Sequence, residues 1–303
     1  GYHALACNTT AKFNTGVGAC AAYANTTGTY NTAVGYRSLK ANTTASYNTA
    51  VGYALVSNTT GACNTGVGVD NLGANTTGCD NTALGFNTLN SNTTSCNNVA
   101  IGNRALTANT TANNNTAVGV CSLYANTTGT GLAALGFRSL AANTCGIRNT
   151  GLGFNALQTN TTGCNNTASG YRALYVNTTG NHNTAVGICG LYDNTTGHSN
   201  IAIGADSLQS NTTGFRNVAV GCTALYSNTT GQLNTAVGTQ TLYTNSSGCQ
   251  NTASGYNALF YNTTGCRNVA VGRSALQSNT TASFNTSVGV CALFANTTAA
   301  DNT

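Results

Sequence analysis

The sequence predicts an all-β fold, a parallel β-solenoid (β-roll) of about eighteen coils of 17 residues each. First, Asn-Thr-Ala-Val-Gly recurs every 17 residues, as at Asn31 and Asn48. Second, the chain contains no Pro, which fits a backbone whose N–H groups nearly all join a ladder that Pro would interrupt. Third, each repeat carries Gly, Asn and Thr at several places, and these residues favour turns or strands over helix interiors.

The repeats divide the whole chain, and we number the first Asn of each repeat position 1. Residues 1–13 are the end of one unit, residues 14–301 form seventeen units, and residues 302–303 begin another. Only the unit that starts at Asn48 is one residue short. No terminal unit turns polar as a solenoid cap would. We therefore expect residues 1–303 to be a single tandem-repeat solenoid without caps or linkers.

Each unit contains one strand and two turns. Thr-Ala-Val at positions 2 to 4 alternates like a half-buried strand, and the Gly at position 5 supplies a bend. Asn-Thr-Thr-Gly at positions 12 to 15 is a second turn signal. Position 9 is Leu in every coil except one, which has Ala22. We expect the Val of position 4 and the Leu of position 9 to fill a narrow core.

Two stretches resemble a known family. Asn98-Val-Ala-Ile-Gly102 and Asn200-Ile-Ala-Ile-Gly204 are similar to the head repeats of YadA-type trimeric autotransporter adhesins, and similar repeats occur in tail fibres. The resemblance covers positions 1 to 8 of every coil and implies a parallel β-roll, trimeric and left-handed in that family, that serves as a surface adhesin or spacer. Here the repeat is longer, and the additional residues lie around Asn-Thr-Thr.

Position 12 is the strongest functional signal, because it is always Asn and is followed at position 14 by Thr, Ser247 or Cys145. Asn-x-Thr/Ser is the N-glycosylation acceptor sequence, so we expect covalent glycans along this column. The alternatives are a bare ladder of stacked amides and O-glycosylation of Thr. Coils about 4.8 Å apart would crowd branched glycans and prevent full occupancy. The expected glycan acceptors are Asn8, Asn25, Asn42, Asn58, Asn75, Asn92, Asn109, Asn126, Asn143, Asn160, Asn177, Asn194, Asn211, Asn228, Asn245, Asn262, Asn279 and Asn296.

Thirteen Cys without a CxxC motif indicate an oxidising compartment. Position 16 carries Cys in two pairs of adjacent coils, Cys79 with Cys96 and Cys249 with Cys266. Stacked strands place such residues about 4.8 Å apart, within the range that a disulfide spans. We expect these four cysteines to be candidate disulfide partners.

Position 10 is often aromatic. Two interpretations stay open: a stripe that stacks on sugars or on a neighbouring filament, and rings that stack on one another and stabilise the solenoid. The aromatic residues of this column are Tyr23, Tyr124, Tyr175, Tyr192, Tyr226, Tyr243, Phe260 and Phe294.

The sequence contains few features that indicate catalysis or the binding of metals, nucleic acids or membranes. The three His and five Asp are scattered, with no carboxylate pair for acid–base work, so we expect no enzyme, no catalytic residue, no metal site and no cofactor apart from the covalent glycans. The net charge of +5 is not clustered, which disfavours nucleic-acid binding. No apolar run is long enough to span a membrane.

These observations predict a structural protein of an extracellular or cell-surface filament, N-glycosylated, self-assembling, and mechanical or protective in role. Its expected partners are copies of itself and glycans. The alternative is an adhesin or tail-fibre shaft, a YadA-like trimeric binding module whose tip lies outside this segment. A minor alternative is an ice-binding solenoid; it is weakened because neighbouring Thr at positions 13 and 14 would point to opposite faces of a strand.

Overall fold

The computed structural model describes residues 1–303 and contains seventeen strands and no helix. All strand pairs are parallel, and the predicted all-β parallel β-solenoid is confirmed. The chain forms two compact units, Gly1–Asn149 and Thr150–Thr303. The same coil is repeated within each unit, and the predicted single uninterrupted array stays a prediction.

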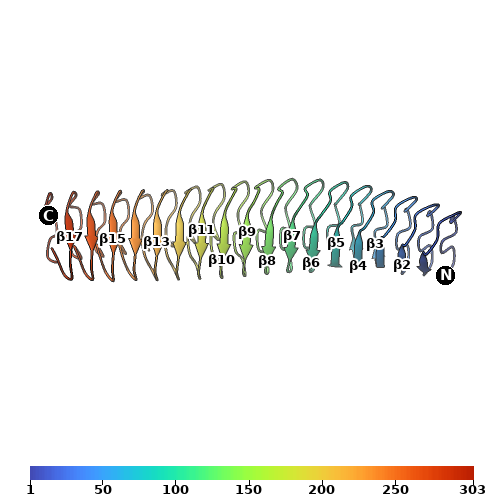
Figure 1. Ribbon diagram of the computed structural model, residues 1–303, viewed down its shortest axis with the longest axis horizontal. Coiled ribbons are helices and arrows are strands. Elements are labelled where there is room, and N and C mark those ends of the chain that lie inside the picture. The colour runs from blue at the N-terminus through green and yellow to red at the C-terminus, as the bar shows by residue number, and fades with distance from the viewer. The chain divides into compact units, whose positions relative to one another are not determined.

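Figure 1 labels the strands, most of which cover positions 2 to 4 of a repeat. The first unit contains β1 (Thr15–Val17), β2 (Thr32–Val34), β3 (Thr49–Ala54), β4 (Thr65–Asn71), β5 (Thr82–Phe86), β6 (Val99–Ile101), β7 (Thr116–Val118) and β8 (Ala133–Leu135). The second contains β9 (Thr150–Leu152), β10 (Thr167–Ser169), β11 (Thr184–Val186), β12 (Ile201–Ile203), β13 (Val218–Val220), β14 (Thr235–Val237), β15 (Thr252–Ser254), β16 (Val269–Val271) and β17 (Thr286–Val288).

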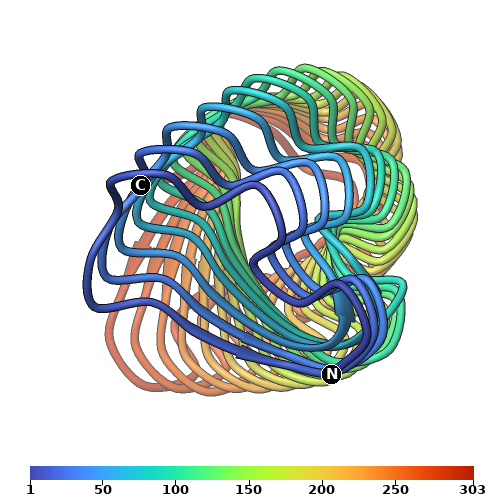
Figure 2. The same cartoon turned by 90° about the vertical axis from the view of Figure 1, so that its right-hand side faces the viewer.

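Neighbouring strands pair in register, each residue opposite its equivalent in the next coil. In the second unit, for example, Thr184 pairs with Ile201 and Val186 with Ile203. In Figure 2 the coils of the first unit, drawn in blue to green, lie one behind the next. The backbone of one coil is therefore the hydrogen-bonding partner of the next coil.

The core of each coil is made by the Ala of position 3 and the Leu of position 9. Ala202 and Leu208 are fully buried, as are most of their equivalents along both units, whereas Leu5 and Leu293 are half-buried. The expectation that Val of position 4 fills the core is wrong, because Ile203, Val186 and their equivalents lie on the outer face of the sheet. The coil is narrow, so the strand turns its small side chain inward and its branched side chains outward.

The turns use left-handed backbone conformations at residues other than Gly. Positions 7, 9 and 17 have φ between about +47° and +62°, as at Asp206, Leu208 and Arg216. The Gly of position 5 adopts a φ near +129° at Gly204, and a Cβ there would lie 2.6 Å from the carbonyl oxygen of Gly221 in the next coil. This close backbone approach explains why position 5 is always Gly.

The short unit lacks its position-7 residue. Tyr53 pairs with Val69 and Ala54 pairs with Asn71, so Asp70 is left without a counterpart in the preceding coil. The strands β3, β4 and β5 are longer than the others at this place. A missing residue thus changes the local shape of the coil and leaves the core register unchanged on either side.

Candidate functional site

The Asn residues of positions 1 and 12 form two internal ladders. In the coil that starts at Asn200, the side-chain amides of Asn200 and Asn211 both donate to the carbonyl oxygen of Gly214, at 2.8 and 3.0 Å. Asn211 Nδ2 also donates to Oδ1 of Asn194 in the preceding coil at 2.7 Å, and Asn228 Nδ2 donates to Oδ1 of Asn211 at 2.9 Å. Each position-12 amide therefore links three coils and closes its own turn.

The contacts of these ladders disfavour glycan attachment at most of the expected acceptors, and glycosylation of the position-12 column stays a prediction. Asn211 donates both hydrogens of Nδ2 to groups inside the protein. It is one of sixteen position-12 residues, Asn25 through Asn279, that are fully buried. A glycan would replace one of these hydrogens and would need space that the neighbouring coils fill. The bare amide ladder is therefore the alternative that the contacts support. Asn8 and Asn296 are not fully buried, so their glycosylation stays a prediction.

The Thr residues that follow have different roles. At position 13 the hydroxyl donates to the position-13 carbonyl of the next coil, as from Thr212 Oγ1 to Thr229 at 3.1 Å. The position-14 side chain, such as that of Thr213, is exposed. The two residues lie in a bend and not in a strand, so the expectation that they point to opposite sheet faces is wrong. Position 14 is the one exposed column that is Thr in nearly every coil, because the exposed position 17 varies among residues such as Tyr30, Asp80 and Arg216.

An apolar stripe follows the outer face of the strands in each unit. Position 4 carries Val, Leu or Ile in nearly every coil, and position 6 often carries Tyr, Phe, Val or Ile. In the second unit these side chains expose between 38 and 56% of their surface, and Val288 and Val290 in the last coil of this sequence expose 71 and 72%. We call this surface the sheet face, and its exposed members in the second unit are Leu152, Phe154, Tyr171, Val186, Ile188, Ile203, Val237, Tyr256, Val271, Val288 and Val290.

Sequence reasoning missed the sheet face, although one signal was present. Ser169 and Ser254 stand at position 4 in place of an aliphatic residue, which a buried core position would accept only if each hydroxyl found a partner. Arg side chains border the stripe: Arg172 lies over the ring of Tyr171 at 5.1 Å, and Arg37 lies over Tyr36 at 5.2 Å.

Five of the eight aromatic residues of position 10 stack on a ring of the same column, as one of the two interpretations predicted, whereas Tyr23, Tyr124 and Phe294 have no aromatic residue at position 10 of a neighbouring coil. The ring centroids of Tyr226 and Tyr243 are 5.1 Å apart and those of Tyr243 and Phe260 are 5.1 Å apart, with nearly parallel planes. Tyr175 and Tyr192 stack in the same way. These rings therefore stabilise the stacking of coils. The five stacked residues are half-buried.

The two expected cysteine pairs are brought together. The Sγ atoms of Cys79 and Cys96 lie 2.7 Å apart, and so do those of Cys249 and Cys266. All four are present as thiols. The hydrogen bond to Cys96 is the main cause that raises the pKa of the Cys79 thiol to about 12, and burial is the main cause that raises the pKa of Cys249 to about 11.

We expect oxidation to join Cys79 to Cys96 and Cys249 to Cys266 and to raise stability by about 3 kcal/mol per closed loop. The free energy of unfolding of the reduced chain should depend on pH. The folded state keeps thiol protons at a pH at which an unfolded thiol with a pKa of 9.0 loses them. The contribution of the protonated thiols to stability is complete below pH 9.0 and is lost as the pH rises toward 11 and 12. Guanidinium unfolding of the reduced and oxidised chains across this pH range measures both effects.

The control for this experiment is Cys222→Ser, since Cys222 has no cysteine in the equivalent place of either neighbouring coil. This variant should keep the pH dependence, and Cys79→Ser combined with Cys249→Ser should reduce it. Peptide mapping that finds other partners for these cysteines in the oxidised chain would contradict the assignment.

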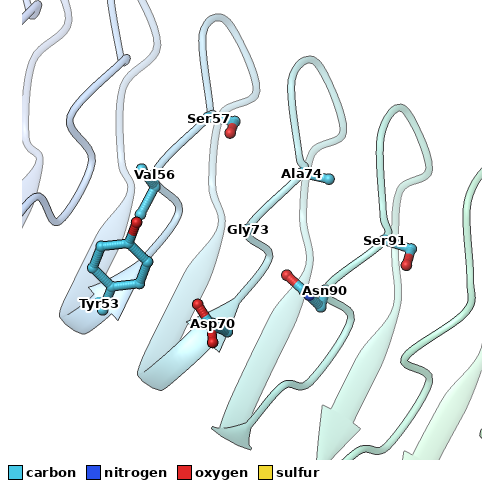
Figure 3. A pocket seen from close by; sticks show the side chains of 8 residues that line it. All are labelled: Tyr53, Val56, Ser57, Asp70, Gly73, Ala74, Asn90 and Ser91. Atoms are coloured by element: carbon cyan, nitrogen blue, oxygen red, sulfur yellow. The ribbon is translucent and has the colours of Figure 1, made fainter.

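The short coil carries a pocket with a volume of about 460 Å³. Gly73 leaves a gap at position 10 between Val56 and Asn90, and Tyr53 and Asp70 lie beside it (Figure 3). Asp70 carries the only charge of the lining, so the pocket favours neutral or cationic molecules over anions. Its lining consists of Tyr53, Val56, Ser57, Asp70, Gly73, Ala74, Asn90 and Ser91.

No group of three or more His, Cys, Asp or Glu side chains is placed to hold a metal ion. The structure also has no helix that could cross a membrane. The comparisons with known proteins add no relative: no family model and no curated protein matches this chain.

Proposed function

We propose that the chain is a segment of an extracellular structural fibre that assembles with copies of itself through the sheet face. Its role would be mechanical and protective, without catalysis and without a cofactor. The observation that carries this proposal is the apolar stripe at positions 4 and 6, whose members include Ile203, Ile188 and Tyr256. The extracellular location rests on the thirteen cysteines.

The exposed apolar area is large enough for a stable interface. A full side chain of this kind has about 150 to 200 Å² of surface, so the nine sheet-face residues that precede the last coil of the second unit expose on the order of 700 Å². Monomeric proteins seldom expose a contiguous apolar patch above about 600 Å². A standard protein interface buries about 800 Å² on each partner.

A second copy of this chain is the partner whose shape fits best. Its own stripe has the same spacing from coil to coil, so two columns of side chains can interdigitate along their length, as in packed sheets. The stripe itself carries few charges: Arg273 is the only charged residue at positions 4 and 6. Two copies therefore meet without bringing many like charges together.

We expect the purified chain to self-associate, and Ile203→Asp combined with Val237→Asp to weaken association at least about 100-fold, because each variant would bury unpaired carboxylates. Sedimentation velocity and negative-stain electron microscopy measure this. Thr213→Asp combined with Thr230→Asp is the matched control: it adds the same two negative charges on the exposed position-14 column of the same unit and should leave association unchanged. A wild-type chain that stays monomeric at high concentration would refute the proposal.

The second candidate is an adhesin or tail-fibre shaft of the YadA kind, which the Asn-x-Ala-Ile-Gly segments of β6 and β12 favour. The number of copies separates the two functions. Closed particles of three chains favour the shaft, whereas particles that grow with concentration favour the structural fibre. The ice-binding alternative gains no support, since only position 14 is both exposed and uniformly Thr apart from Cys145 and Ser247.

A further inference from the structure

Three N-glycosylation acceptor sequences lie outside the position-12 column, and their Asn residues differ in burial. They are Asn114-Asn-Thr, Asn165-Asn-Thr and Asn285-Thr-Ser. Asn285 is fully buried in the position-1 ladder, where its Nδ2 donates to Ala299 at 3.0 Å. Asn165 is half-buried, and its Nδ2 lies 3.4 Å from Nε2 of His182. Asn114 is exposed.

We propose that Asn114 is a site of N-linked glycosylation on this protein, and that Asn165 is a second site of lower occupancy. The position-12 residues Asn25 through Asn279 are buried in this structure, so we place the modification at position 17. This inference rests on the proposed extracellular function, because N-glycosylation takes place in the secretory pathway.

The surroundings of Asn114 provide the space that a glycan needs. Its side-chain amide makes no hydrogen bond within the protein, in contrast to Nδ2 of Asn109 in the same unit, which donates to Asn92 and Ala112. The equivalent residue of the next coil is Gly131, and the nearest atom to a Cβ placed there is 3.8 Å away. The next coil therefore presents no side chain at this position.

The local backbone also suits an acceptor. Asn114 has a φ of +61° in the turn that precedes β7, and Asn tolerates this left-handed conformation better than most residues. Thr116, the hydroxyl residue of the acceptor sequence, begins the strand and is only half-buried. A sugar on Asn114 would leave the Asn115 ladder contact to Gly129, at 3.0 Å, in place.

The reaction is a group transfer from a lipid-diphosphate-linked oligosaccharide. Nδ2 of Asn114 attacks the anomeric carbon of the first sugar, the bond from that carbon to the diphosphate oxygen breaks, and the lipid diphosphate leaves. Nδ2 gives up one proton, which passes through a base of the transferase to the solvent, and keeps one hydrogen. No internal hydrogen bond of the coil is lost at Asn114, whereas the same step at Asn109 would remove one.

The test is secretion of the full chain from a eukaryotic cell, followed by enzymatic release of N-glycans in ¹⁸O-labelled water and peptide mapping. We expect the label at Asn114, partial label at Asn165 and none at Asn109 in protease-resistant, folded protein. Asn114→Gln should abolish the modification at this site alone, and Gln is tolerated there because Gln250 occupies the same position with a φ of +56°.

An unmodified Asn114 in the secreted chain, or glycans on Asn109 in folded protein, would overturn the inference. Self-association is measured separately on chain made in a bacterial cytoplasm, which carries no glycans. A failure of the fibre proposal in that experiment and a failure of the Asn114 assignment here are therefore distinguishable.

Discussion

Gly204→Ala is expected to destabilise the coil around β12 by about 3 to 5 kcal/mol. The φ of Gly204 is +129°, a conformation that residues with a Cβ rarely adopt, and the new methyl group would lie 2.6 Å from the carbonyl oxygen of Gly221. That oxygen belongs to the backbone of the next coil and cannot move without separating the two strands. Hydrogen exchange across residues 183–237, together with guanidinium unfolding, measures the loss.

Gly190→Ala is the matched control in the same unit. A Cβ at Gly190 would meet its nearest neighbour, Cβ of Ala185, at an ordinary 3.6 Å. Ala173 and Ala224 occupy the same position of other coils. This variant should be neutral or more stable by up to about 1 kcal/mol, since Ala restricts the unfolded chain. Equal destabilisation by the two variants would show that the close approach at position 5 is not the cause.

Asn211→Ala should cost about 3 kcal/mol, because it removes three hydrogen bonds and leaves buried groups of Asn194 and Asn228 with fewer partners. In a solenoid each coil interacts mainly with its neighbours, so exchange should increase first in the coils that adjoin Asn211. Guanidinium unfolding gives the total loss, and hydrogen exchange gives its location.

Thr213→Ala separates the structural role of this Asn from a glycan acceptor role. It destroys the acceptor sequence of Asn211 but removes only an exposed side chain, so stability should change by less than about 0.5 kcal/mol. If the unglycosylated Thr213→Ala variant lost as much stability as Asn211→Ala, the amide ladder would not explain why position 12 is always Asn.

The repeat predicted the architecture correctly. The expectation about the core was wrong because the sequence did not show which face of the strand is buried. Thr-Ala-Val at positions 2 to 4 was correctly predicted as a strand, and the missing residue of the unit at Asn48 was visible as a shorter interval. A strand places alternate residues on opposite faces, and the pattern around Ala202 permits either face to be the core. Hydrophobicity favoured Ile203, whereas the narrow coil buries Ala202.

The glycan expectation depends on access to the Asn side chain, which three neighbouring residues of sequence do not reveal. An acceptor sequence consists of three neighbouring residues. Access to the side chain of Asn211 depends instead on Asn194 and Asn228, each 17 residues away. The same pattern at Asn114 lies in an open turn because the next coil has Gly131 at the equivalent position. Burial therefore had to be known before these identical motifs could be distinguished.

By itself, the sequence determined the coil length, the parallel strands, the place of the bend at position 5 and the proximity of Cys79 and Cys96, because these depend on the period alone. The tertiary structure decided which face is inside, which Asn is accessible, and that Leu208 and its equivalents adopt a left-handed φ near +50°. That conformation is unfavourable for an isolated Leu, by about 1 to 2 kcal/mol. It persists here because burial of the side chain and the hydrogen bond from Leu208 to Ala224 in the next coil, at 2.9 Å, stabilise it.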